Sequence, residues 1–376
     1  MLRSSFQRHH CLFQKAVLGA RFHTRCLSVG EQGTFAEGLE EAVRLLKEDQ
    51  IVGIPTETVY GLGGNALSEK AVSKIFEAKN RPPDNPLIVH VSSLSMLKSI
   101  LPNNDIPKLY LPLLNAFWPG PLTLLFPKSE LIPDIVTCGQ PTVAIRFPKH
   151  PITQALIEKF GKPVAAPSAN TSGKPSPTLA EHVCRDLSGK IPLVLDGGAC
   201  NVGVESTVLN GLTVPPVILR PGGITYEQIR AVPGFEDVRV YQRDFSDKEM
   251  EKKPPTPGMK YRHYAPDAPV ILVECDEGVE DTLQKIASEI QNASAKVGVL
   301  RTSSFPLKHR GLPVVEYSLG DGNHPDQVAR ELFKGLRILD GSGVKFIIVE
   351  GIKEDHEGLA VMNRLRKAAD KIVTSV

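Results

Sequence analysis

The chain has 376 residues, of which 41% are hydrophobic and 23% charged, and its formal net charge is +2. This length and composition are typical of a globular protein with two domains, and they exclude a fibrous or largely disordered chain. No apolar stretch approaches the roughly 20 residues that a membrane-spanning helix needs, so no membrane partner is expected.

Residues 1–30 differ in composition from the rest of the chain. They contain Arg3, Arg8, Lys15, Arg21 and Arg25 but no acidic residue. An Arg-rich, Ser-containing segment with apolar positions is typical of a mitochondrial presequence, and a disordered basic tail is the alternative. We therefore expect a targeting leader over residues 1–30 and a mitochondrial or cytoplasmic location. The remaining chain is close to neutral, so bulk electrostatic binding of nucleic acid is not expected.

The cysteines are scattered and show neither zinc-ligand spacing nor a dense disulfide pattern. We expect reduced thiols and no protein metal site.

Helix and strand patterns follow one another from residue 35 to residue 242. Helical spacing of apolar residues predicts helices over 37–49, 68–78, 152–159 and 179–187. Short apolar runs predict strands at 51–54, 87–91, 122–126, 143–147, 164–166, 193–195, 207–209 and 217–219. These elements indicate a mixed α/β domain over residues 35–242.

Residues 243–269 are rich in charge, proline and glycine, which indicates a linker. After it, strands are predicted at 270–274, 296–300 and 345–350, with helices that begin at Asp281, His324 and Leu359. The alternation predicts a smaller, doubly wound α/β domain over residues 270–376.

The segment 55–66, PTETVYGLGGNA, follows the first predicted strand, and open α/β sheets bind ligands where strands end. It lacks the lysine of a Walker A loop and the third glycine of a dinucleotide fingerprint. A glycine-rich turn with only a structural role is the alternative.

Two cations, Lys79 and Arg81, follow the helix predicted at 68–78, and a proline-rich turn with Asn85 comes next. Paired cations at a loop opening suit a polyphosphate, although cations at a helix end also stabilise the helix dipole. At a helix end, their loss is expected to affect folding little. In the strand that follows, Leu87, Val89 and Val91 share one face and His90 takes the other, where it is either functional or merely packed.

The strand at 143–147 shows the same alternation. Arg146 and Thr142 lie on the face opposite Val143, Ile145 and Phe147. An arginine and a hydroxyl on one face suit a carboxylate ligand, and a surface salt bridge is the alternative.

Hydroxyls, an amide and a further cation lie near the ends of other predicted strands, namely Ser168, Ser176 and Ser206, Asn170, and Arg220. The pattern indicates a concave site with neither a catalytic triad nor a metal cluster. Catalysis in such a site depends on positioning and on stabilising charge, which suits adenylation chemistry.

Four motifs in order, PTETVYGLG, KNRPPDNPL, PSAN and STV…LRPGG, resemble the YrdC-type threonylcarbamoyl-AMP synthase family. PGMKYRHYAP and GLAVMNRLRKAA resemble its two-domain form, which has a C-terminal Rossmann-like domain. The resemblance covers residues 36–375. It implies a twisted mixed sheet with a concave active site, followed by the smaller domain.

The resemblance also implies a reaction in which L-threonine, bicarbonate and ATP give threonylcarbamoyl-adenylate and pyrophosphate, with Mg²⁺ on the phosphates. A downstream threonylcarbamoyl transferase uses the product to modify an adenosine next to the anticodon of tRNA. Direct contact between this protein and tRNA is a further partner that the resemblance leaves open. By motif position, Lys79 and Arg81 are catalytic. L-threonine is bound by Thr58, His90, Arg146, Ala166 and Ser206, and ATP by Arg81, Asn85, Thr142, Ser168, Ser176 and Arg220.

The linker contains a dense aromatic and cationic cluster of five residues, Lys260, Tyr261, Arg262, His263 and Tyr264. We expect it to fold over the first domain as a lid that excludes water. A passive spacer is the alternative.

Two other functions remain open at this point. One is an RNA-binding module without adenylation activity, which predicts salt-sensitive RNA affinity. The other is a carbamoyl-transferring maturation domain of the kind fused to hydrogenase assembly factors. That function is expected with upstream zinc-finger and acylphosphatase-like segments, which the sequence does not contain.

Overall fold

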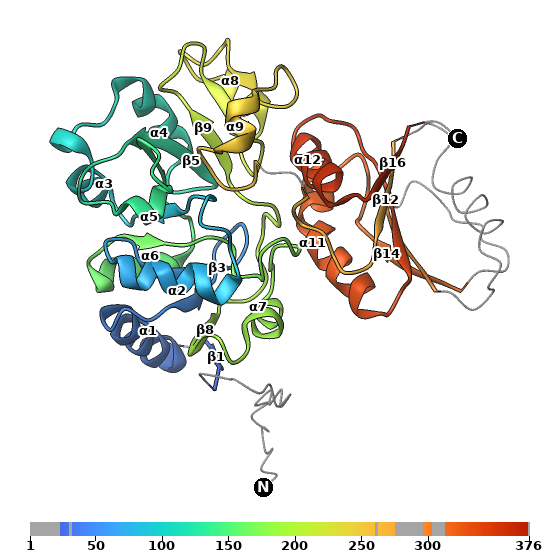
Figure 1. The fold of residues 1–376 in the computed structure, drawn as a ribbon, viewed down its shortest axis with the longest axis horizontal. Helices are drawn as coiled ribbons and strands as arrows, with labels where there is room; N and C mark the ends of the chain where they lie inside the picture. The colour runs from blue at the N-terminus through green and yellow to red at the C-terminus, as the bar shows by residue number, and fades with distance from the viewer. Residues whose placement is uncertain (1–22, 30–31, 260–261, 275–295, 303–312, 375–376) are drawn as a thin grey trace, which may run out of the picture.

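The computed structural model describes residues 23–29, 32–259, 262–274, 296–302 and 313–374, which form two α/β domains and a linker (Figure 1). The larger domain has a mixed sheet and the smaller domain has a parallel sheet. The predicted fold class is confirmed. The helix expected from Asp281 lies outside the described residues.

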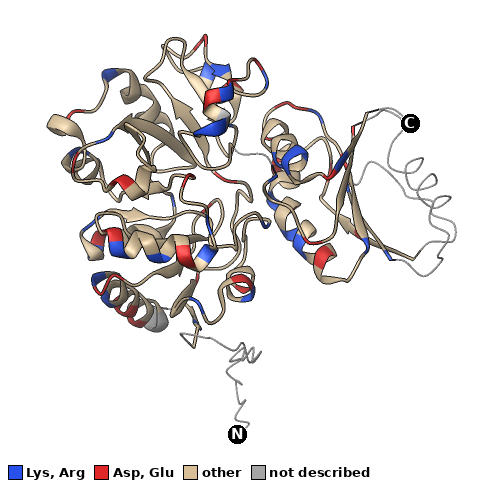
Figure 2. Ribbon diagram, viewed as in Figure 1, with Lys and Arg blue, Asp and Glu red and all other residues tan. Residues whose placement is uncertain are grey.

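Charged residues of both signs are interspersed along the helices of both domains (Figure 2). Among the described residues, no helix combines the length and the apolar character needed to cross a membrane.

The first sheet has eleven strands in a mixed arrangement. In spatial order they are β1 (Arg25–Ser28), β8 (Leu193–Asp196), β2 (Val52–Ile54), β3 (Gly61–Asn65), β7 (Val164–Ala165), β4 (Ile88–His90), β6 (Thr142–Arg146), β5 (Leu122–Pro127), β9 (Thr207–Asn210), β10 (Val217–Arg220) and β11 (Arg239–Val240).

Helices cover both faces of this sheet. Those described in the first domain and linker are α1 (Gln32–Lys47), α2 (Glu69–Lys79), α3 (Leu94–Ser99), α4 (Leu111–Phe117), α5 (Asp134–Thr137), α6 (Pro151–Phe160), α7 (Ala180–Leu187), α8 (Tyr226–Arg230) and α9 (Lys248–Lys252), with 3₁₀ turns at Pro102–Asn104 and Lys108–Tyr110. Helices α1 and α6 pack in one core cluster, whereas α2 and α7 pack in another. Ser68 is the N-cap of α2, because its Oγ accepts from the Ala71 amide at 3.3 Å.

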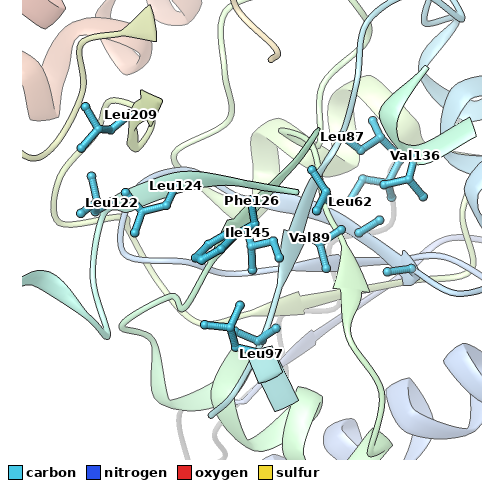
Figure 3. Packing of buried hydrophobic residues seen from close by; sticks show 14 of the residues in the cluster. Leu62, Leu87, Val89, Leu97, Leu122, Leu124, Phe126, Val136, Ile145 and Leu209 are labelled. Atoms are coloured by element: carbon cyan, nitrogen blue, oxygen red, sulfur yellow. The ribbon is translucent and has the colours of Figure 1, made fainter. Parts of the chain in front are cut away.

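The main core lies between α2, α3 and the central strands of the sheet. Alternate residues of these strands, including Leu62, Val89, Leu124 and Ile145, point into it (Figure 3). The residues between them therefore point to the other face of the sheet, where the pocket described below lies.

Strand β3 corrects the sequence analysis, which placed a glycine-rich turn at Gly61–Asn65. These glycines form a buried central strand because neighbouring elements leave no room for side chains. A Cβ at Gly61 would lie 3.2 Å from the Cβ of Ala166, and one at Gly64 would lie 3.1 Å from Ile75 Cδ1.

Strand β1 lies inside the segment that the sequence analysis assigned to a leader. Arg25–Ser28 pairs in parallel with β8, and Arg25 forms an ion pair with Glu41 of α1 at 2.8 Å. Residues 25–28 thus belong to the sheet of the first domain.

The second sheet is parallel, with the order β14 (Val314–Ser318), β13 (Val297–Arg301), β15 (Phe346–Glu350), β12 (Val270–Val273) and β16 (Lys371–Val373). Helices α11 (Pro325–Gly341) and α12 (Gly358–Ala368) cover the face of this sheet that is turned toward the first domain (Figure 1).

Candidate active site

A pocket that is partly open to solvent lies where the middle of the first sheet meets the linker, and its empty space, the open part included, is about 520 Å³. Its walls come from the β2–β3 loop, strands β4 and β6, the loop after β7, and the segments around β9 and β10. The residues that line it are Thr56, Thr58, Val59, Gly61, Arg81, Ile88, His90, Arg146, Ala166, Pro167, Ser168, Glu205, Ser206, Arg220, Pro257, Gly258, His263 and Tyr264.

A row of polar side chains crosses the floor of the pocket. His90 of β4 and Arg146 of β6 are register partners, and Arg146 is also the partner of Thr123 in β5. Directly opposed residues project from the same face of a sheet. The row continues to Ser206, whose hydroxyl lies 2.7 Å from Thr123 Oγ1. This confirms the prediction that His90 and Arg146 lie on the face of the sheet opposite the apolar residues of their strands.

The Arg146 guanidinium is fixed on three sides. It donates to the Gly120 carbonyl at 3.2 Å and to Thr58 Oγ1 at 2.9 Å, and its Nη2 lies 2.7 Å from Glu57 Oε1. An arginine has five N–H donors, so donors remain for a ligand. Arg146 is thus a buried, oriented cation and not the surface salt bridge considered above.

Burial, followed by the charge of Arg146, lowers the pKa of His90 to about 3. The ring is therefore neutral near pH 7. Its Nδ1 lies 3.2 Å from the Ile88 carbonyl oxygen.

The other half of the pocket contains two buried cations. Arg81 donates to the carbonyls of Asn85 at 2.9 Å and Pro86 at 2.8 Å, and burial lowers its pKa to about 10, so it stays charged at neutral pH. Arg220 donates to the Ser206 carbonyl at 2.9 Å and to the Pro257 carbonyl at 3.2 Å. This half has the charge that an anionic ligand requires.

Lys79 does not line the pocket. Its side chain is 1% exposed, and its ammonium donates to the carbonyl oxygens of Ser168 and Asn170. Burial lowers the pKa of Lys79 well below its ordinary value. Lys79 supports the loop that carries Ser168, and its burial argues against the expectation that its loss affects folding little. A catalytic role for Lys79 stays a prediction.

Three residues predicted to bind ATP, namely Asn85, Thr142 and Ser176, also lie outside the pocket lining. Asn85 and Ser176 are buried. Thr142 begins β6, four residues before Arg146, which places it about 13 Å away along the strand. The two therefore cannot hold one carboxylate together, and ATP binding by these three residues stays a prediction.

Ala166 lines the pocket, and its amide is occupied by the Ile88 carbonyl oxygen at 2.9 Å. A contact from Ala166 to a substrate would therefore use its carbonyl oxygen.

The linker lies against the first domain and forms one side of the pocket. His263 and Tyr264 line it together with Pro257 and Gly258, and the Ala265 amide donates to the Gly173 carbonyl at 2.8 Å. Arg262 instead points away to Asp370 at 2.8 Å, and Lys260 and Tyr261 lie outside the described residues. A passive spacer would not make these contacts.

Two buried glutamates were missed by the sequence analysis. Glu57 pairs with Arg146, and Glu205 lines the pocket and pairs with Arg364 at 3.0 Å. In the sequence, each of them appears as an acidic residue next to hydroxyl-bearing and apolar residues, in the segments PTETV and VESTV. Such a carboxylate needs a buried partner, but the sequence does not tell which residue provides it.

Both domains of the chain match known protein families. Residues 44–222 match the Sua5_yciO_yrdC family model, whose description is telomere recombination. Residues 224–370 match the model of the threonylcarbamoyl-AMP synthase C-terminal domain.

Similar proteins match over nearly the whole chain. A threonylcarbamoyl-AMP synthase of Schizosaccharomyces pombe is 47% identical over 93% of this chain and 92% of its own length. One from Bacillus subtilis is 47% identical over 88% and 92%. The crystal structure of Pyrococcus abyssi Sua5 complexed with L-threonine superposes with a TM-score of 0.83 at 44% identity, covering 93% of this chain and 99% of that one. The chain therefore belongs to the threonylcarbamoyl-AMP synthase family, in its two-domain Sua5 form.

Proposed function

We propose that this protein condenses L-threonine, bicarbonate and ATP into threonylcarbamoyl-adenylate, with release of pyrophosphate. One observation carries the proposal. A single pocket joins the polar row of His90 and Arg146 to the buried cations Arg81 and Arg220. An amino acid and a nucleotide phosphate can therefore meet in it. The match to the threonine complex of P. abyssi Sua5 supports the assignment of the first substrate.

Arg146 binds the threonine carboxylate in this proposal, using the donors that Gly120, Thr58 and Glu57 leave free. Neutral His90 adds no charge beside it, and the Ala166 carbonyl oxygen accepts from the threonine amine. The Ser206 hydroxyl, oriented by Thr123 and Arg220, completes this half of the site.

The threonine ammonium group must first lose a proton to solvent, which gives the neutral amine that reacts. Its nitrogen then attacks the carbon of bicarbonate, water leaves, and a carbamate forms. A carbamate oxygen next attacks the α-phosphorus of ATP, and pyrophosphate departs. Arg81 and Arg220 stabilise the charge on the phosphates, while His263 and Tyr264 shield the labile carbamate from water.

Magnesium would accompany the nucleotide. Among the described residues, no group of three or more His, Cys, Asp or Glu side chains is placed to hold a metal ion. Glu205 lines the pocket, but one of its oxygens accepts from Ser176 and the other pairs with Arg364. The described residues thus do not form a protein magnesium site. Mg²⁺ bound by phosphate oxygens and water is consistent with its usual coordination.

The product is a reactive adenylate, so we propose that a threonylcarbamoyl transferase acting on tRNA consumes it. From the basic composition of residues 1–24, which precede β1, we also propose a mitochondrial pool beside a cytoplasmic one.

The test is incorporation of labelled bicarbonate. Purified protein is incubated with ATP, threonine and ¹³C-bicarbonate, and the products are analysed by mass spectrometry. We expect an adenylate that contains threonine and one labelled carbon. A threonine adenylate without the label would refute the proposal.

A further inference from the structure

Arg364 belongs to α12 of the C-terminal domain, but its side chain reaches into the first domain. It is 0% exposed. Its Nε donates to Glu205 Oε2 at 3.0 Å, and its Nη1 donates to the carbonyl oxygens of Pro221 and Ala360. The partner of a pocket residue therefore comes from the other domain.

Glu205 is an ionised carboxylate in the lining of the pocket. Burial acts to raise its pKa, but the charges of Arg364 and Arg220, with the hydrogen bond from Ser176, lower it below its ordinary value. The Ser176 hydroxyl donates to Glu205 Oε1 at 2.5 Å. Both oxygens of the carboxylate thus have fixed partners, one from each domain.

A bare carboxylate would oppose the binding of a triphosphate in the same pocket. Like charges repel strongly where water is excluded. Arg364 removes this conflict, because it neutralises Glu205 and leaves the positive charge of Arg220 for the ligand.

The same helix also supports the linker. The Arg364 guanidinium carbon lies 5.6 Å from the centre of the Tyr264 ring. Lys367 donates to the Gly258 carbonyl, and the His263 amide donates to the Lys367 carbonyl at 3.0 Å. Helix α12 therefore contacts both the carboxylate in the lining and the linker beside it.

We infer that Arg364 is a positioning residue for the nucleotide half of the site, which acts by neutralising and orienting Glu205. The C-terminal domain thereby completes the site of the first domain. This inference rests on the proposed function.

The experiment compares Arg364→Met with wild type in a pyrophosphate-release assay, varying ATP and threonine separately. We expect the KM for ATP to rise by about tenfold or more, because breaking a buried charge pair is costly. The KM for threonine should stay within about twofold, since Arg146 and His90 do not contact Arg364. The control is Arg366→Met on the same helix, whose partners Glu274 and Glu354 lie outside the pocket lining.

A second substitution tests whether the effect passes through Glu205. Adding Glu205→Gln to Arg364→Met removes the unpaired charge, so the KM for ATP should fall back toward the wild-type value. If Arg364→Met does not fold, Arg364→Lys keeps the cation, and a smaller rise confined to the KM for ATP is expected.

Each result of these measurements either supports or contradicts the inference. A lower kcat with both KM values unchanged, equal rises in both, or no recovery in the double variant would overturn the inference. Wild-type protein without any threonine-dependent pyrophosphate release would instead refute the proposed function, so the two failures are distinguishable.

Discussion

Arg146 and Glu57 form an ion pair of 2.7 Å whose side chains are only 5% and 10% exposed. The pair lies beneath the substrate pocket and fixes the guanidinium that we assign to the threonine carboxylate. A buried pair of this kind costs free energy to desolvate, so its value here lies in orientation more than in stability.

Replacing Arg146 should separate the two substrates. In Arg146→Lys the cation remains but the planar fork is lost, so we expect the KM for threonine to rise by the equivalent of about 1.5 to 3 kcal/mol. The KM for ATP should change far less. Steady-state kinetics measures both, with Arg44→Lys on the exposed side of α1 as the control. Equal effects on the two substrates would remove Arg146 from the threonine site.

The Glu57 carboxylate should contribute to acid unfolding. Burial acts to raise the pKa of Glu57, but Arg146 and backbone hydrogen bonds lower it below its ordinary value of 4.5. The unfolded state then binds the proton more readily. The stability that Glu57 contributes is present above that value and is lost as pH falls through the lowered pKa. Below pH 4.5, the free energy of unfolding measured in urea should fall less steeply with decreasing pH in Glu57→Gln than in wild type. Identical slopes would contradict this.

Lys79→Met tests the support of the Ser168 loop. The substitution leaves the buried carbonyls of Ser168 and Asn170 without their donor, which costs about 1–3 kcal/mol for each unsatisfied group. We expect a lower unfolding temperature and a higher KM for ATP. Lys70→Met, at an exposed position of the same helix, should change neither. An unchanged unfolding temperature in Lys79→Met would favour the earlier view of an ordinary helix-end cation.

Gly258→Ala tests the fit of the linker. Gly258 has a φ of +86°, and an added Cβ would lie 2.8 Å from both Arg220 Cδ and Tyr264 Oη. We expect slower synthesis and weaker ATP binding because the linker must move. Gly161→Ala is a matched control, with a φ of +75° and no atom within 4 Å of the added Cβ. Both variants carry the strain of a positive φ, about 1 kcal/mol. The same activity in both would show that the linker contacts are unimportant.

Local patterns in the sequence predicted the parts of the fold that depend on local physics. Alternation in β4 and β6 placed His90 and Arg146 opposite the apolar core residues of their strands, on the face that lines the pocket. Strand β3 was missed because its glycines have no apolar side chains, and only the packing of neighbours explains them.

The site could be predicted only where its motifs resemble a known family. Arg364 lies 159 positions from Glu205, and no periodicity links the two. Thr142 shares a face with Arg146 but lies at the other end of the strand, and sequence alternation says which face a residue takes but not which ligand it reaches.

The most direct test of the account is pyrophosphate release by the full chain, measured with threonine and bicarbonate each omitted in turn. The account predicts that release requires both, because the carbamate and not threonine itself attacks ATP. Full release without bicarbonate would contradict it and would make the protein an ordinary aminoacyl-adenylate former.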